Sequence, residues 1–164
     1  VNKSIASNAS NAQENRTDNL NSFDTDGFTV GAEGGDKNVN YSGDNYVAWN
    51  WKAGTTGSGT TTGSGTGKAY SYSVNTTAGF SIVKYLGNGS AGHTIPHHLG
   101  ATPQMLIIKN LSGTTSWVVY HHKNTSAPET DILRLDTDAA TADDASSTSS
   151  SITYGSPAKT TIPT

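Results

Sequence analysis

Five histidines are the side chains of this sequence with the most versatile chemistry, and they fall into two groups. One group is His93, His97 and His98, and the other is the adjacent pair His121 and His122. Imidazole is the commonest protein ligand for metals. Adjacent side chains of a strand point to opposite faces, however, so only one member of each pair can reach a shared ion. We therefore predict loop and rim histidines and no metal site.

An acidic turn, Asp24–Thr25–Asp26–Gly27, begins like a calcium-binding loop. An EF-hand loop needs an oxygen ligand at its fifth position and a glutamate at its twelfth. Here the fifth position is Phe28 and the twelfth is Gly35, so an EF-hand is excluded. We predict an Asp-Gly turn at the end of a strand. An irregular calcium site with Asp36 or Asp44 is the alternative.

The sequence offers no recognisable catalytic constellation. It has no G-x-S-x-G nucleophile motif, and no phosphate loop, because Gly67–Lys68 is followed by Ala69. Asp131 and Asp136 flank a predicted strand and have the residue types of a glycosidase pair, but aspartates at strand ends more often cap turns. We predict that the protein is not an enzyme and carries no cofactor.

The aromatic side chains can form either a sugar-stacking surface or a core. A core is favoured, because Ile, Leu, Val and Phe make up only 26 of the 164 residues and the aromatics must supply buried area. Trp49 and Trp51 alternate with Tyr46 and Asn50, so we assign the tryptophans to the core and the latter two to the surface. The residues predicted to contact a ligand or another subunit are Tyr46, Asn50, His93, His97, His98, His121 and His122.

Short alternating or apolar runs bounded by turn residues predict strands along most of the chain. Met105–Ile108 is a continuous apolar run, which indicates a strand buried on both faces, and it forms a hairpin with the run that follows Gly113. The predicted strands are Phe28–Val30, Tyr46–Trp51, Ala69–Val74, Phe80–Tyr85, Met105–Ile108, Trp117–Tyr120 and Asp131–Asp136.

These runs predict an all-β fold, an antiparallel sandwich or jelly-roll-like domain, because no stretch has a helical apolar period. We place the sandwich at residues 23–136, with a flexible Gly/Ser/Thr-rich loop at 54–67. Residues 1–22 and 137–164 are predicted to be extended polar arms, the second with a β-like island at Ile152–Tyr154.

Charge and hydropathy exclude two classes of partner. A formal net charge of −3 and a pI near 5.9 argue against nucleic acid. No apolar run has the length that a membrane span needs, so membrane insertion is not expected.

Three segments resemble a recurrent β-rich module of virion structural proteins from marine tailed bacteriophages, of the tail-fibre or appendage type. They are DTDGFTVG (Asp24–Gly31), SGDNYVAWNWKAG (Ser42–Gly54), and the stretch from Asn75 to Asn110 that continues into SWVVYHH. His98 stands where the family usually has glycine.

The resemblance implies a virion structural domain with no catalytic residues, located on the surface of the phage particle. It implies a homo-oligomer, with a trimer favoured, that contacts other virion proteins. The alternatives are a carbohydrate-binding domain that attaches to a host surface glycan, and a head-fibre or capsid-decoration protein.

Overall fold

The computed structural model describes residues 3–32 and 39–143, and these residues are nearly all β. Strands make up 37% of them, the sheets are antiparallel, and no α-helix is present among them. The one helical turn of this part of the chain is the short 3-10 turn η1 (Pro128–Thr130). The prediction of an all-β fold is confirmed. The predicted island at Ile152–Tyr154 lies outside the described residues.

The chain divides into two compact units, and their limits do not fall at the predicted boundaries of 22/23 and 136/137. The first unit contains Val1–Asn50, Ile108–Val118 and Arg134–Ala139. The second contains Trp51–Ile107, Val119–Leu133 and Ala140–Thr164. In the described chain no helix is long and apolar enough to cross a membrane.

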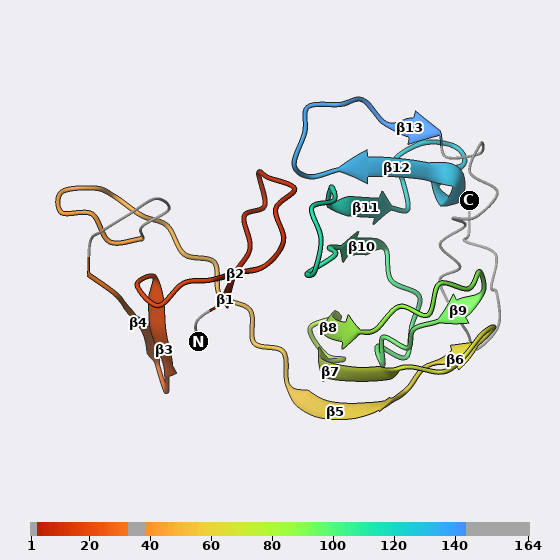
Figure 1. Cartoon of the computed structure of the whole chain (residues 1–164), viewed down its shortest axis with the longest axis horizontal. Coiled ribbons are helices and arrows are strands. Elements are labelled where there is room, and N and C mark those ends of the chain that lie inside the picture. Colours follow the sequence, from red (N-terminus) through yellow and green to blue (C-terminus); the bar gives the residue numbers. More distant parts are fainter. Residues whose placement is uncertain (1–2, 33–38, 144–164) are drawn as a thin grey trace. The chain divides into compact units, whose positions relative to one another are not determined.

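Two hairpins form the N-terminal part of the first unit (Figure 1). Strand β1 (Lys3–Ser4) pairs with β2 (Glu14–Asn15), and β3 (Leu20–Asp24) pairs with β4 (Gly27–Val30). The prediction of an extended arm at residues 1–22 was wrong. This segment contains the first hairpin and the start of the second. The predicted Asp-Gly turn is confirmed, since Asp24 pairs with Gly27 across a two-residue loop.

Three further sheets contain the remaining strands. A three-stranded sheet has the order β5 (Thr55–Thr60), β7 (Ala69–Asn75), β8 (Phe80–Tyr85), and β6 (Thr62–Gly63) pairs with β9 (His93–Thr94). A four-stranded sheet has the order β10 (Met105–Ile108), β11 (Val118–His121), β12 (Asp131–Arg134), β13 (Ala142–Asp143) (Figure 1). The prediction that the runs 105–108 and 117–120 form neighbouring strands is confirmed, because β10 and β11 are adjacent in this sheet.

Three of the local predictions were wrong. The segment 54–67 is not a flexible loop, because it contains β5 and β6. Tyr46–Trp51 is not a strand, because no segment of the described residues pairs with its backbone. β10 is not buried on both faces: Met105 is 51% exposed and Ile107 is 44% exposed, which fits a strand at the edge of its sheet.

The core is small for a chain of this length. Among the described residues the buried apolar side chains are Val74 on β7, Val119 and Tyr120 on β11, and Pro128 of η1, all in the second unit. No described side chain of any size is less than 2% exposed. The scarcity of aliphatic residues in the sequence therefore appears directly as a scarcity of buried apolar surface.

Hydrogen bonds to backbone atoms hold the loop of the first hairpin, residues 6–13. The Trp117 indole donates to the carbonyls of Ala6 at 3.1 Å and Ala9 at 3.2 Å. The Lys109 ammonium lies within 3.3 Å of four carbonyl oxygens, one of which, at 3.1 Å, is that of Ser10. We call these contacts of Lys109 and Trp117 the loop clamp.

We predict that Lys109→Met loosens this loop. The substitution leaves several carbonyls without their donor, and a hydrogen bond from a charged group contributes about 1.5–3 kcal/mol. The backbone N–H of Gln13, which donates to the Leu111 carbonyl at 3.0 Å, reports on the loop. Its hydrogen exchange should become faster in Lys109→Met and change less in Lys109→Arg, which keeps donors. Unchanged exchange in Lys109→Met would show that the clamp does not hold the loop.

Candidate functional site

The three-stranded sheet positions two tyrosines side by side on one face. Tyr70 and Tyr72 are two residues apart on β7, so both side chains point to the same side. Their partners on β5 are Gly59 and Gly57. A Cβ atom at Gly57 would lie 2.6 Å from the Tyr72 ring, and one at Gly59 would lie 2.9 Å from the Tyr70 hydroxyl. The glycines are therefore required because the rings lie across them.

His98 completes this group from the loop that follows β9. Its ring stacks on Tyr72 with centroids 3.7 Å apart and planes at 18°, and on Tyr70 at 5.7 Å and 26°. Its Nε2 also lies 3.2 Å from the Tyr70 hydroxyl. All three residues are half-buried.

The backbone of His98 is unusual. Its φ of 60° makes it the one non-glycine residue of the described chain with a positive φ. A left-handed conformation costs an ordinary residue about 1–2 kcal/mol. The position therefore suits glycine, and the stacking contacts offset the cost for histidine.

His97 supports the same loop. Its Nδ1 accepts a hydrogen bond from the backbone N–H of Leu99 at 3.2 Å. Burial lowers the pKa of His97, and the neighbouring charge of His98 lowers it further. The ring is therefore held neutral, with the acceptor nitrogen facing the chain. We call Tyr70, Tyr72, His97 and His98 the histidine–tyrosine cluster.

The other histidines that the sequence analysis named as contact residues, His93, His121 and His122, have partners within the second unit. His93 shares a hydrogen bond with the hydroxyl of Thr61, which is the buried polar side chain of the described residues and also accepts the Lys68 N–H at 2.7 Å. His121 and His122 have ring centroids 5.2 Å apart, tilted by 58°. Over residues 3–32 and 39–143, no group of three or more His, Asp or Glu side chains could hold a metal ion.

The segment 46–51 differs most from expectation. Trp49 is 75% exposed and Trp51 is 67% exposed, so their assignment to the core was wrong. Tyr46 is exposed, as predicted, and its hydroxyl accepts the N–H of Tyr41 at 3.0 Å. Asn50 is also exposed. Trp51 has one ring neighbour, Phe80, with centroids 6.2 Å apart.

Asp24, Asp131 and Asp136, which have residue types that could bind calcium or act in a glycosidase pair, accept hydrogen bonds from other residues of the chain. Asp24 accepts from the hydroxyls of Ser22 and Thr29, at 2.8 Å and 2.9 Å. Asp131 accepts from Thr125, and Asp136 accepts the N–H of Trp117 at 3.0 Å. These contacts fit structural capping. Of the two residues named for the alternative calcium site, Asp36 lies outside the described residues, and Asp44 is exposed, with its backbone N–H donating to the Tyr41 carbonyl at 3.3 Å.

The glycines of β5 and the hydroxyl of Thr61 were not identified from the sequence as parts of this site. A signal for the glycines is present, because Gly57-Ser58-Gly59 and Tyr70-Ser71-Tyr72 share the same two-residue spacing. What the arrangement offers chemically is a half-buried group of stacked aromatic rings with a phenol hydroxyl and an imidazole.

Comparison with known proteins gives one match. A family model described as a domain of unknown function, DUF7483, matches residues 1–162. No curated protein and no solved structure matches the chain.

We predict that alanine and glycine at position 98 differ in their effect on stability, because the backbone of His98 is left-handed. His98→Ala loses the stacking and keeps the left-handed cost, so it should lower the free energy of unfolding by about 1 kcal/mol. His98→Gly loses the same stacking but removes the strain, so it should be about 1 kcal/mol more stable than the alanine variant. Urea denaturation measures the difference. Equal stabilities would contradict a left-handed residue at this position.

The pKa of His97 predicts a loss of stability in acid. Because the folded-state pKa lies below the usual 6.5, the unfolded chain takes up the proton first as the pH falls. The contribution of His97 is complete above pH 6.5 and is lost as the pH falls toward the lowered pKa. His97→Asn, which keeps an acceptor for Leu99 but does not titrate, should flatten this part of the pH dependence. Melting temperatures at several pH values would test it, and an unchanged pH dependence would refute it.

Proposed function

The chain belongs to the DUF7483 family of domains of unknown function, and we propose that it is a structural component of a tailed-phage virion. In this proposal it forms part of a tail fibre or similar surface appendage and works through the assembly of identical subunits. The resemblance of its segments to phage appendage proteins supports the virion part of the proposal. The observation that carries the assembly part is the exposure of large apolar side chains.

Four of the exposed large apolar residues lie in the short segment 46–51, which pairs with no strand among the described residues. Val47 is 73% exposed, and the two tryptophans that follow are exposed to a similar extent. Burying one such side chain contributes about 1.5–3 kcal/mol, so a second copy that covers the segment gains several times that amount. The described part of a single subunit has few buried apolar side chains with which to stabilise itself. Assembly supplies the buried surface that the subunit lacks.

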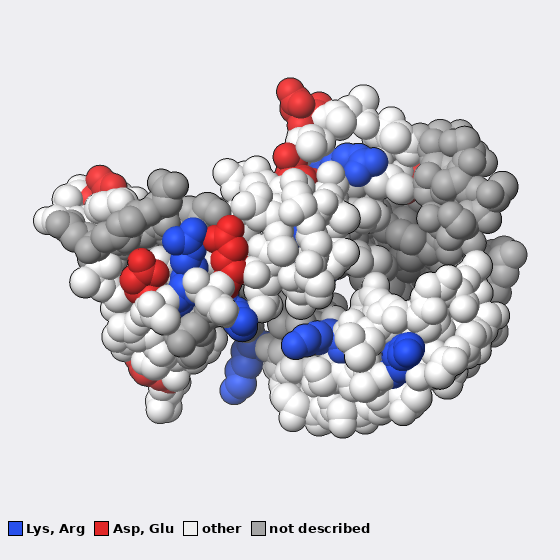
Figure 2. Space-filling model, viewed as in Figure 1, with Lys and Arg blue, Asp and Glu red and all other residues white. Residues whose placement is uncertain are grey.

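A homo-oligomer is the arrangement that we propose, with a trimer favoured by the resemblance to fibre chains. A head fibre or a capsid-decoration protein would use the same surface. In all three cases the protein lies on the virion surface, contacts other virion proteins and catalyses no reaction. On the face seen in Figure 2 the basic side chains are scattered or lie beside acidic ones and form no continuous basic patch, which supports a proposal without nucleic acid as partner.

Attachment to a host glycan is the second candidate function. Sugars pack their C–H faces on aromatic rings, and the stacked rings of Tyr70, Tyr72 and His98 are half-buried rather than covered. Tyr46 and Asn50 are exposed and have the residue types of a sugar contact. This function is compatible with assembly if the domain lies at the tip of an appendage.

The assembly proposal predicts that Trp49 and Trp51 hold subunits together. The double substitution to serine should convert the oligomer to monomers in analytical ultracentrifugation, whereas substitution to phenylalanine, which keeps the apolar surface, should leave it assembled. Tryptophan emission should move to longer wavelength on dilution, because Trp49 and Trp51 are two of only three tryptophans.

Two results would contradict the proposal. One is a protein that is monomeric at every concentration. The other is an oligomer that survives the double serine substitution unchanged. The virion assignment is tested separately, by mass spectrometry of purified phage particles, and absence of the chain from the particles would refute it.

A further inference from the structure

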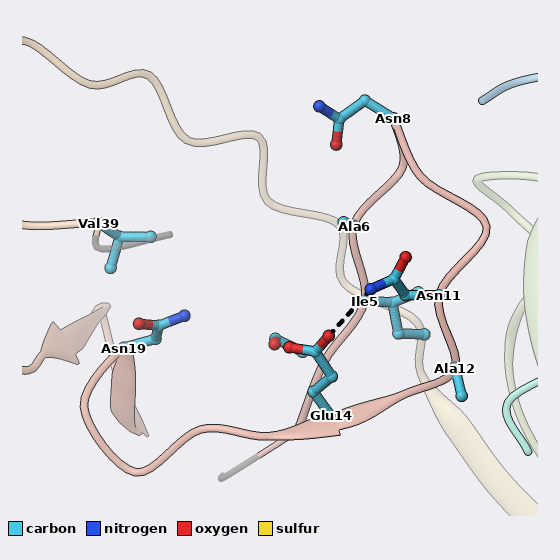
Figure 3. Close-up of a pocket in the computed structure, with 9 residues that line it drawn as sticks. Ile5, Ala6, Asn8, Asn11, Ala12, Glu14, Asn19 and Val39 are labelled. Carbon is cyan, nitrogen blue, oxygen red and sulfur yellow. Dashed lines mark hydrogen bonds between the residues drawn. The ribbon is translucent and has the colours of Figure 1, made fainter. Parts of the chain in front are cut away.

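The first unit contains a pocket of about 340 Å³ beside the β1–β2 hairpin (Figure 3). Small-molecule sites occupy roughly 300–1000 Å³, so this pocket has room for a ligand of the size of a sugar ring. In Figure 3 the carboxamide of Asn19 and the carboxylate of Glu14 face each other across the pocket. The pocket is lined on several sides by Ile5, Ala6, Asn8, Asn11, Asn19 and Val39.

The loop that forms one wall of the pocket is held in place by the loop clamp. The pocket-lining residues Ala6, Asn8, Asn11 and Ala12 all belong to residues 6–13. The carbonyls of this loop accept hydrogen bonds from Trp117 and Lys109, neither of which lines the pocket. These hydrogen bonds fix the loop without occupying the pocket. A ligand therefore does not have to order the loop, which reduces the entropic cost of binding.

Among the described residues that line the pocket, Glu14 is the one charged side chain, and its charge is paired by Arg16, which lies outside the lining. Arg16 binds the Glu14 carboxylate through two nitrogens, at 2.8 Å and 3.1 Å, so each charge is neutralised by the other. The other oxygen of Glu14 accepts a hydrogen bond from Asn11 at 3.3 Å. Such a pocket gives no advantage to an anion or a cation.

Two carboxamides of the pocket remain available to a ligand. Within the described residues the side chains of Asn8 and Asn19 have no hydrogen-bond partner. A carboxamide both donates and accepts, which matches the hydroxyl groups of a sugar. The aliphatic side chains of Ile5 and Val39 match the C–H face of such a ring, and none of the described residues that line the pocket is an aromatic that could stack on a nucleobase.

We propose that this pocket binds a neutral polyhydroxylated ligand, a single sugar ring, through Asn8, Asn11 and Asn19. The proposal does not depend on the assembly role, because it uses a different surface. The ring can come from a free sugar or from the end of a glycan chain, and both present the same hydroxyl groups.

Titration with sugars, followed by NMR of the asparagine side-chain amides, tests the proposal. The probes are the methyl glycosides of mannose, glucose and galactose, with glucose 6-phosphate and glucosamine as charged comparators. We expect saturable shifts of the Asn8 and Asn19 amides with at least one glycoside, in the millimolar range typical of such a small ligand, and weaker binding of the charged sugars.

The variants compare asparagines inside and outside the pocket. Asn8→Ala with Asn19→Ala should weaken binding about tenfold, the equivalent of one or two hydrogen bonds. Asn21→Ala is the matched control, because Asn21 is exposed on β3 and does not line the pocket. Since the side chains of Asn8 and Asn19 make no hydrogen bond within the described chain, their removal should leave the fold intact.

Three results would overturn the proposal: no saturation with any neutral glycoside, equal weakening by Asn21→Ala and by the double variant, or a preference for a charged sugar. Loss of binding only in the double variant would support it. A competition with a polysaccharide of whichever sugar binds (mannan, a glucan or a galactan) identifies the source of the ligand. Displacement of the methyl glycoside assigns the pocket to a glycan end, and failure to displace it assigns the pocket to a free sugar.

Discussion

A chain with few aliphatic side chains has to fix its loops mainly through hydrogen bonds to the backbone. Lys109 is the clearest example, because its ammonium satisfies carbonyl oxygens from both the first hairpin loop and its own loop. Trp117 does the same with its indole N–H while its backbone N–H is bound by Asp136. These contacts join segments about a hundred residues apart in the sequence. They keep the first hairpin folded and shape the pocket beside it.

In the second unit, aromatic rings supply the apolar cover that the scarce aliphatic side chains do not. Tyrosines on β7 lie across glycines on β5, so a strand that has no apolar side chain of its own is still covered by apolar surface. His98 then extends the covered area at the cost of a left-handed backbone. A ring that reaches across to a neighbouring strand replaces the aliphatic side chains that such a sheet usually uses.

The sequence predicted the elements whose signal is local. The strands at 69–74 and 80–85 were identified because their side chains alternate, and the Asp24 turn because its residue types are specific to turns. β5 was missed because its apolar cover comes from another strand. The run 46–51 was misassigned because alternation permits a strand but does not supply a partner for its backbone. The stacking of His98 and the pocket depend on contacts between distant segments, which no local pattern contains.

Two kinds of surface in this protein have opposite requirements. A surface that joins subunits gains free energy only when it is covered, and the tryptophan segment fits this because it is apolar and highly exposed. A surface that binds a sugar has to stay accessible and must hold polar groups in fixed positions, which the clamped hairpin loop does for its asparagines. Since different residues meet the two requirements, assembly can cover the tryptophans without using the groups that would contact a sugar. A subunit of this kind can be a structural part and a binding module at the same time.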